Sequence, residues 1–200
     1  MKYVIDMDGV LADFNTAFAR VLAPEGHIIP VQKGTWPAMW NWPHQFFPRD
    51  YVNEIWERVR ASPYFWRDLG EFPWTGKTLH LLGKKQRMLG DEVYFVTARV
   101  GTRVKTQTEL WLRARGYRNP TVIVTSALKK WGVVNDLNAD VVLDDKPKIL
   151  TDIHTHATTS VRCYLQVHPY NMLFAGEHAE RLGITPVSTP MKALQEEELA

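Results

Sequence analysis

The chain has 200 residues, which is enough for one hydrophobic core with a modest appendage but short for two independent domains. Hydrophobic residues make up 45% and charged residues 23%, and the 24 basic against 22 acidic side chains exclude a strongly basic surface for extended nucleic acid. The single cysteine, Cys163, excludes an internal disulfide framework, and no apolar run approaches the roughly 20 residues that cross a membrane. We therefore expect a cytoplasmic protein without a signal peptide.

The first predicted element is a strand that ends in an acidic turn. Residues 3–5 are β-branched or aromatic, which predicts a strand buried on both faces of a parallel sheet. Asp6 ends this strand, Asp8 follows, and Gly9 allows a sharp turn into a helix expected to begin at Val10. Ligands of open α/β sheets bind outside the carboxyl ends of the strands, so both carboxylates are expected to face a ligand.

Residues 14–74 form an aromatic-rich insertion. Helical spacing of apolar residues continues the helix expected from Val10 as far as Leu22 and predicts another over 49–60, whereas residues 24–48 have no regular period. Disordered segments are poor in aromatic residues, so this irregular stretch is expected to be ordered. The insertion carries six of the eight tryptophans, which are Trp36, Trp40, Trp42, Trp56, Trp66 and Trp74.

From residue 75 onward, strands and helices alternate. Strands are predicted at 93–96, 121–124, 141–143 and 161–165, with a short edge strand at 184–187. Helices are predicted over 75–88, 104–112 and 129–137, from Pro147 onward, and as a solvated terminal segment rich in Glu and Leu. This alternation predicts an α/β fold, with a parallel sheet, right-handed connections and helices on both faces.

Polar side chains collect at the ends of separate strands, where a parallel sheet brings them to one crevice. These residues are Asp6, Asp8, Thr97, Lys130, Asp144 and Asp145. Carboxylates are hard oxygen ligands that suit Mg²⁺, whereas thiolates or clustered histidines for a softer metal are lacking near the turn. A hydroxyl and an ammonium beside a bound Mg²⁺ would form a pocket for phosphate oxygens.

These segments resemble the four motifs of the haloacid dehalogenase-like phosphatases. The matching segments are DMDGVLADF at 6–14, Val96-Thr97-Ala98, Lys130 and LDDKP at 143–147. The first string and the size of the insertion look most like the 5'(3')-deoxyribonucleotidases and related phage and bacterial 5'-nucleotidases. The resemblance implies a Rossmann-like core of residues 1–13 and 75–200, and a small, mainly helical cap of residues 14–74.

The resemblance also implies a reaction, which is the Mg²⁺-dependent removal of phosphate from a nucleoside monophosphate, with a deoxyribonucleotide favoured. Asp6 would attack phosphorus to form an aspartyl phosphate, and Asp8 would protonate the leaving alcohol and later deprotonate water. Mg²⁺ would be held by the Asp6 carboxylate, the Asp8 carbonyl oxygen and Asp144. Asp145 would orient the metal's water or Lys130 from a second shell.

The phosphate oxygens would be held by Thr97, Lys130 and the backbone at Ala98, which stands where the deoxyribonucleotidases usually carry a serine. Lys129 is an alternative to Lys130, and Lys146 could be a salt-bridge partner of the acids instead of a phosphate ligand. Candidate substrate contacts are the aromatic residues Phe14, Trp36, Trp40 and Phe65. Burial in a small core of the cap is the default role for the tryptophans of the irregular stretch, and base stacking is the functional alternative.

Other functions stay open at this point. A sugar phosphate or a nucleic-acid 3'-end could be the substrate instead, although the near-neutral charge disfavours long nucleic acid. A non-catalytic binding module with an aromatic cap is a further alternative, but it would not need all of the converging acidic and basic residues. We expect a small-molecule phosphomonoester as the partner, no membrane, and either a monomer or a homodimer.

Overall fold

The structure, a computed structural model, describes residues 1–23 and 38–199. Its centre is a six-stranded parallel sheet in the order β5-β4-β1-β6-β7-β8. The strands are β1 (Lys2–Ile5), β4 (Glu92–Thr97), β5 (Thr121–Val124), β6 (Val141–Asp144), β7 (Arg162–Gln166) and β8 (Ile184–Val187). This order confirms the predicted parallel sheet and the edge position of residues 184–187.

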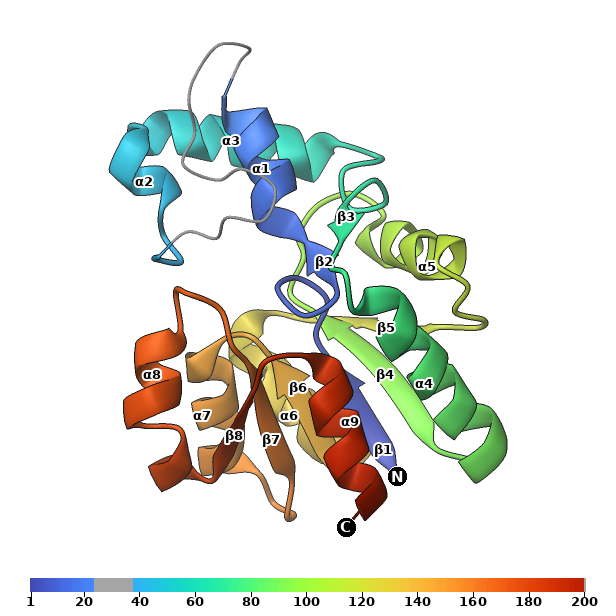
Figure 1. The fold of residues 1–200 in the computed structure, drawn as a ribbon. Coiled ribbons are helices and arrows are strands. Elements are labelled where there is room, and N and C mark those ends of the chain that lie inside the picture. The colour runs from blue at the N-terminus through green and yellow to red at the C-terminus, as the bar shows by residue number, and fades with distance from the viewer. Residues whose placement is uncertain (24–37, 200) are drawn as a thin grey trace.

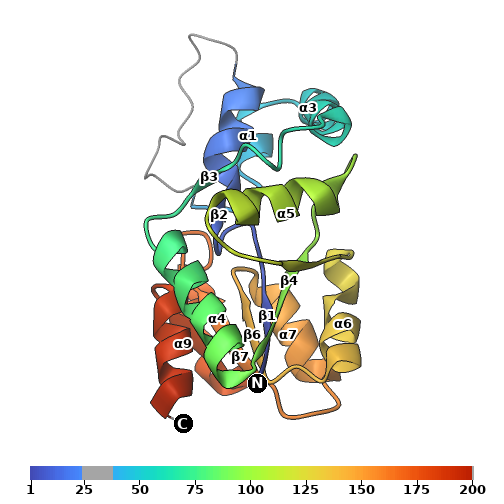
Figure 2. The same ribbon diagram turned by 90° about the vertical axis from the view of Figure 1, so that its right-hand side faces the viewer.

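Helices cover both faces of the sheet, with α4 and α9 on one side and α6 and α7 on the other (Figure 2). The helices of this part are α4 (Thr75–Leu89), α5 (Val104–Ala114), α6 (Lys130–Leu137), α7 (Pro147–His156), α8 (Met172–Glu177) and α9 (Pro190–Leu199). Because side chains alternate along a strand, Tyr3 and Ile5 join one buried cluster with Leu82, and Val4 joins the other with Leu150. Within the described residues, no helix is long and apolar enough to span a bilayer.

Three helices lie above the end of the sheet at which β1 ends (Figure 1). They are α1 (Phe14–Leu22), α2 (Pro43–Phe46) and α3 (Arg49–Ala61). The short strands β2 (Ala12–Asp13) and β3 (Gly70–Glu71) pair antiparallel where the chain enters and leaves this region. Val52, Ile55 and Val59 of α3 belong to the same buried cluster as Tyr3, so apolar packing continues from the sheet into the helices above it. The division into a core and a cap at residues 14 and 75 stays a prediction.

The helix expected at Val10 begins at Phe14 instead. Val10 is fully buried in a tight turn, in which the amide of Ala12 donates a hydrogen bond to the carbonyl of Met7 (2.8 Å). Strand β2 then precedes the helix, and the Asp13 side chain accepts a hydrogen bond from a free amide of the first helical turn. Val10 is apolar because it is buried in this turn. Hydrophobic periodicity alone does not distinguish such a buried turn from the start of a helix.

The terminal helix α9 is half-buried, and the expectation of a solvated helix is wrong. Ala193 and Leu194 are fully buried, and the Glu197 carboxylate is buried as well. Glu197 accepts a hydrogen bond from the hydroxyl of Tyr164 (2.6 Å) and pairs with Arg162 (2.7 Å). The helix covers the sheet face beside α4, and these contacts pair the Glu197 carboxylate where it is buried.

Candidate active site

Three carboxylates meet where β1 and β6 end. Asp6 follows β1, Asp144 ends β6, and Asp145 comes next, and the two strands are hydrogen-bonded neighbours. One carboxylate oxygen of each residue lies within 4.8 Å of the others. The residues are 5%, 1% and 0% exposed, respectively, so their charges are largely removed from water. The predicted convergence of Asp6 with Asp144 is therefore confirmed.

Lys130 lies between two of these carboxylates. Its Nζ is 2.6 Å from Oδ1 of Asp6 and 2.7 Å from Oδ2 of Asp144, and the lysine is buried at the start of α6. Burial alone would lower the pKa of Lys130, but the charges of Asp144 and Asp6 outweigh burial and raise it. Lys129 is exposed, so Lys130 is the lysine that contacts the acidic cluster.

Asp145 is the third carboxylate and lies against Gly9 of the acidic turn. Burial raises the pKa of Asp145 well above its usual range, and the charge of Asp144 adds to this rise. The Tyr170 hydroxyl donates a hydrogen bond to its Oδ2, while its Oδ1 is buried without a hydrogen-bond partner among the described residues. Gly9 has φ +86°, and a Cβ on Gly9 would lie 2.3 Å from Oδ2 of Asp145. Glycine at this position therefore allows the turn and the carboxylate to lie in contact.

The acidic cluster fits a divalent cation. Asp6, Asp144 and Asp145 offer hard oxygen ligands, and a single ammonium group, that of Lys130, lies between two of them. Burial raises the pKa of Asp144 as well as that of Asp145, so the interior disfavours this much negative charge without a further cation. The orphaned oxygen of Asp145 is a free ligand of the same kind. Asp145 therefore lies beside the two expected carboxylate ligands.

The Asp8 carboxylate is turned away from this cluster and pairs with Arg99. The Nε of Arg99 donates to Oδ2 of Asp8 (2.9 Å), and Nη2 donates to Oδ1 (2.7 Å). The Asp8 side chain keeps 16% of its surface exposed, whereas that of Arg99 has none. Asp8 is thus the more exposed of the two acids of the turn, and its carboxylate is held by a cation of its own.

Thr97 and Ala98 lie on the neighbouring strand end, as predicted. Thr97 ends β4 and is buried, and its hydroxyl accepts a hydrogen bond from the amide of Arg99 (3.3 Å). Ala98 borders the cavity described next. The strand places both residues beside Asp6, because β4 is paired with β1.

A cavity of about 480 Å³ lies between the acidic turn and the helices above it. Its polar floor includes Asp6, Asp8 and Lys130, and its walls are rich in aromatic side chains. These wall residues are Phe14, Phe18, Trp40, Trp42, Trp56 and Trp66. A volume of this size is typical of sites for small molecules.

Of the four residues predicted to contact substrate, two border the cavity. Phe14 borders the cavity, with ring centroids of Trp56 and Trp66 at 5.7 and 5.8 Å. Trp40 also borders it, and the Nζ of Lys146 lies 4.1 Å from the centroid of the Trp40 ring. Phe65 packs edge-on against Phe14 (6.2 Å) behind the cavity wall. Trp36 lies outside the described residues.

The sequence pattern does not indicate three residues that support this site. Arg99 holds Asp8, Tyr170 holds Asp145, and Nε2 of His168 lies 2.5 Å from the carbonyl oxygen of Gly9. Burial lowers the pKa of His168, which favours the neutral ring in this contact with Gly9. Arg99 lies two residues after Thr97 in a strand-end loop, and the rule for carboxyl ends of strands could have drawn attention to it.

Comparison with known proteins identifies the fold. No protein-family model and no curated protein matches the sequence. Among solved structures, a haloacid dehalogenase-like hydrolase of Burkholderia xenovorans LB400 is similar at 14% identity over 97% of each chain, with a TM-score of 0.58. A haloacid dehalogenase-like family hydrolase of Xanthomonas campestris is similar at 13% identity over 98% of this chain and 96% of that one (TM-score 0.50). An L-2-haloacid dehalogenase is similar at 12% identity over 100% and 99% (TM-score 0.54). The chain therefore has the fold of haloacid dehalogenase-like hydrolases.

Proposed function

We propose that this protein is a Mg²⁺-dependent phosphomonoester hydrolase that acts on a nucleoside monophosphate. The observation that carries the proposal is the buried group of Asp6, Asp144 and Asp145, with Lys130 between the first two and Asp8 at the floor of the adjoining cavity. Transfer of a phosphoryl group needs a nucleophile, a cationic surround for its oxygens and an acid for the leaving group. The site offers each of these.

The proposed reaction has two steps. Asp6 attacks phosphorus, the ester P–O bond breaks, and Asp8 gives a proton to the leaving alcohol, which yields an aspartyl phosphate on Asp6. Water then attacks the phosphorus of that intermediate while Asp8 takes its proton, which releases phosphate and restores Asp6. Lys130, with Thr97 and the backbone at Ala98, holds the non-bridging oxygens.

In this proposal Asp6, Asp144 and the carbonyl oxygen of Asp8 would hold Mg²⁺. Asp145 would join them as a ligand instead of acting from a second shell, because its carboxylate lies in the same cluster. When bound, the ion offsets the repulsion between the carboxylate nucleophile and the phosphate dianion. Lys130, which contacts both Asp6 and Asp144, would also keep the nucleophile oriented before substrate arrives.

The cavity walls support a nucleotide over a sugar phosphate. Stacking of a base on an aromatic side chain contributes about 1–3 kcal/mol, and Phe14, Trp40 and Trp56 border the cavity. The chain's near-neutral charge does not favour an extended phosphate backbone. A cavity of about 480 Å³ also has the size of a small-molecule site, which suits a mononucleotide better than an oligonucleotide.

A substrate panel tests the proposal. Phosphate release is measured with deoxyribonucleoside and ribonucleoside monophosphates, sugar phosphates and a 3'-phosphorylated oligonucleotide, each with and without Mg²⁺. We expect the highest kcat/KM for a nucleoside monophosphate, and turnover only with the metal. Turnover of the oligonucleotide alone would overturn the substrate assignment. Because one structure of this fold is an L-2-haloacid dehalogenase, halide release from 2-chloropropionate is measured too, and its appearance without phosphate release would replace the proposal.

Mg²⁺ is expected to stabilise the fold in the absence of substrate. A ligand at about 100 times its Kd adds about 2.7 kcal/mol to the free energy of unfolding. For a chain of this size, that corresponds to a rise in Tm of about 5–10 °C. Thermal unfolding is measured with and without the ion, and the variant Asp145→Asn is expected to show a smaller rise. A rise of the same size in Asp145→Asn would remove Asp145 from the set of ligands.

A further inference from the structure

The Asp8 carboxylate is bound by Arg99, a side chain to which the proposed reaction assigns no role. Two nitrogens of the Arg99 guanidinium bond the two oxygens of Asp8, at 2.9 and 2.7 Å. The planar fork of an arginine matches a carboxylate in this way and fixes its orientation as well as its position. Arg99 borders the cavity, but none of its side chain is exposed. It therefore cannot take hold of a bound substrate directly and acts through Asp8.

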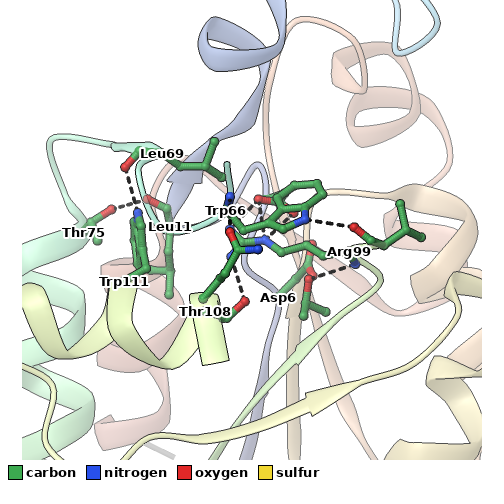
Figure 3. Close-up of polar contacts among 12 residues, drawn as sticks. Asp6, Leu11, Trp66, Leu69, Thr75, Arg99, Thr108 and Trp111 are labelled. Carbon is green, nitrogen blue, oxygen red and sulfur yellow. Dashed lines mark hydrogen bonds and ion pairs between the residues drawn. The ribbon is translucent and has the colours of Figure 1, made fainter. Parts of the chain in front are cut away.

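The Arg99 guanidinium is itself held by Thr108 and Trp66 (Figure 3). Its Nη1 donates to the hydroxyl of Thr108 on α5 (3.0 Å), and its Cζ lies 5.0 Å from the centroid of the Trp66 ring. Trp66 is held in turn, because its indole donates to the carbonyl of Val100 (2.9 Å) and its amide donates to the side chain of Gln107 (3.0 Å). A helix of the core and a residue of the insertion thus set the position of one buried cation.

This arrangement also separates the acids of the turn. Asp6, Asp144 and Asp145 share the candidate metal site, and the Asp8 carboxylate is not part of that group. Asp8 is only two residues from Asp6, so a side chain free to rotate could approach the same cation. The contact with Arg99 keeps it on the cavity side instead.

We propose that Arg99 is the positioning residue for Asp8. Its fork aims the Asp8 carboxylate at the place where the alcohol of a phosphomonoester departs, and it keeps that carboxylate out of the metal group. The inference rests on the proposed function. Proton transfer requires the acid within hydrogen-bond reach of the leaving oxygen, so loss of the fork should slow the step that breaks the ester bond.

The test compares two esters that differ in their need for an acid. Phenyl phosphate has a poor leaving group, whereas the phenolate of 4-nitrophenyl phosphate leaves without a proton. The value of kcat/KM reports the ester-breaking step for each. For Arg99→Lys, which keeps the charge and loses the fork, we expect a fall of about 100-fold with phenyl phosphate. With 4-nitrophenyl phosphate, the fall should be less than about 10-fold.

Three further variants separate a positioning role from a general loss of activity. Thr108→Val removes one hydrogen bond from Arg99 with little change of shape, and should give the same preference at a loss of about 3–10-fold. Arg67→Lys is the matched control, because Arg67 is exposed and contacts Asp68 and the ring of Tyr64, neither of which borders the cavity. In an Asp8→Asn background, Arg99→Lys should add little, since the two residues act as a unit.

Equal losses for both esters in Arg99→Lys and Thr108→Val would overturn the positioning role and leave the phosphatase proposal standing. Failure of the wild-type chain to release phosphate with Mg²⁺ from these esters and from every nucleoside monophosphate of the panel would overturn the proposed function and this inference with it. A selective loss with phenyl phosphate that disappears in the Asp8→Asn background would support the inference.

Discussion

Replacing Asp6 by asparagine is expected to lower phosphate release by about 10⁴-fold or more. The side chain keeps its shape but loses the charged oxygen that attacks phosphorus. The remaining contact of Lys130 with Asp144, at 2.7 Å, should keep the site folded, because it does not involve position 6. The measurement is kcat with a nucleoside monophosphate and with 4-nitrophenyl phosphate, together with Tm, so that lost activity is separated from lost structure.

Two observations accompany this experiment. Asp68→Asn is the matched control, since Asp68 is exposed and pairs with Arg67, and it should leave kcat unchanged. Wild-type enzyme quenched in acid during turnover should carry a phosphoryl group on the peptide that contains Asp6, and Asp6→Asn should carry none. An unchanged rate in Asp6→Asn, or a phosphoryl group at another residue, would end the assignment of Asp6 as the nucleophile.

Lys130→Met should reduce stability more than any other single change in the site. Breaking a buried ion pair by removing one partner typically costs about 3–5 kcal/mol, because the other charge stays buried without compensation. Here two carboxylates, those of Asp6 and Asp144, lose the same cation. We expect a fall of that size in the free energy of unfolding, measured by urea denaturation without metal, and loss of phosphatase activity.

Neighbouring variants separate the charge effect from a general effect of the substitution. Lys129→Met changes the adjacent, exposed lysine and should alter stability by no more than about 0.5 kcal/mol. In an Asp144→Asn background, Lys130→Met should cost less, because one of the stranded charges is gone. Mg²⁺ should restore part of the lost stability by replacing the missing positive charge. Equal effects of the changes at 129 and 130 would contradict the role given to Lys130.

The sequence determined the strands of the sheet and the positions of the candidate site residues at the strand ends. Short β-branched runs such as 141–143 lie between helical segments, and this local alternation is sufficient to predict parallel strands. Because parallel strands end at one edge, residues as distant in the chain as Asp6 and Asp144 could be placed together from their strand-end positions alone. The same rule placed Lys130 among the site residues, and its spacing to Asp144 favoured it over Lys129. In the structure Lys130 is buried against Asp6 and Asp144, whereas Lys129 is exposed.

The tertiary structure decided which side chain each acid meets. Asp8 pairs with Arg99 across 91 residues, and Asp145 accepts its hydrogen bond from Tyr170 in the loop after β7. Neither contact follows from periodicity, because each depends on how a loop is seated once the strands have paired. For the same reason the burial of α9 was not predicted: a pattern shows which face of a helix is apolar, but only packing decides whether a charged residue such as Glu197 is enclosed with it.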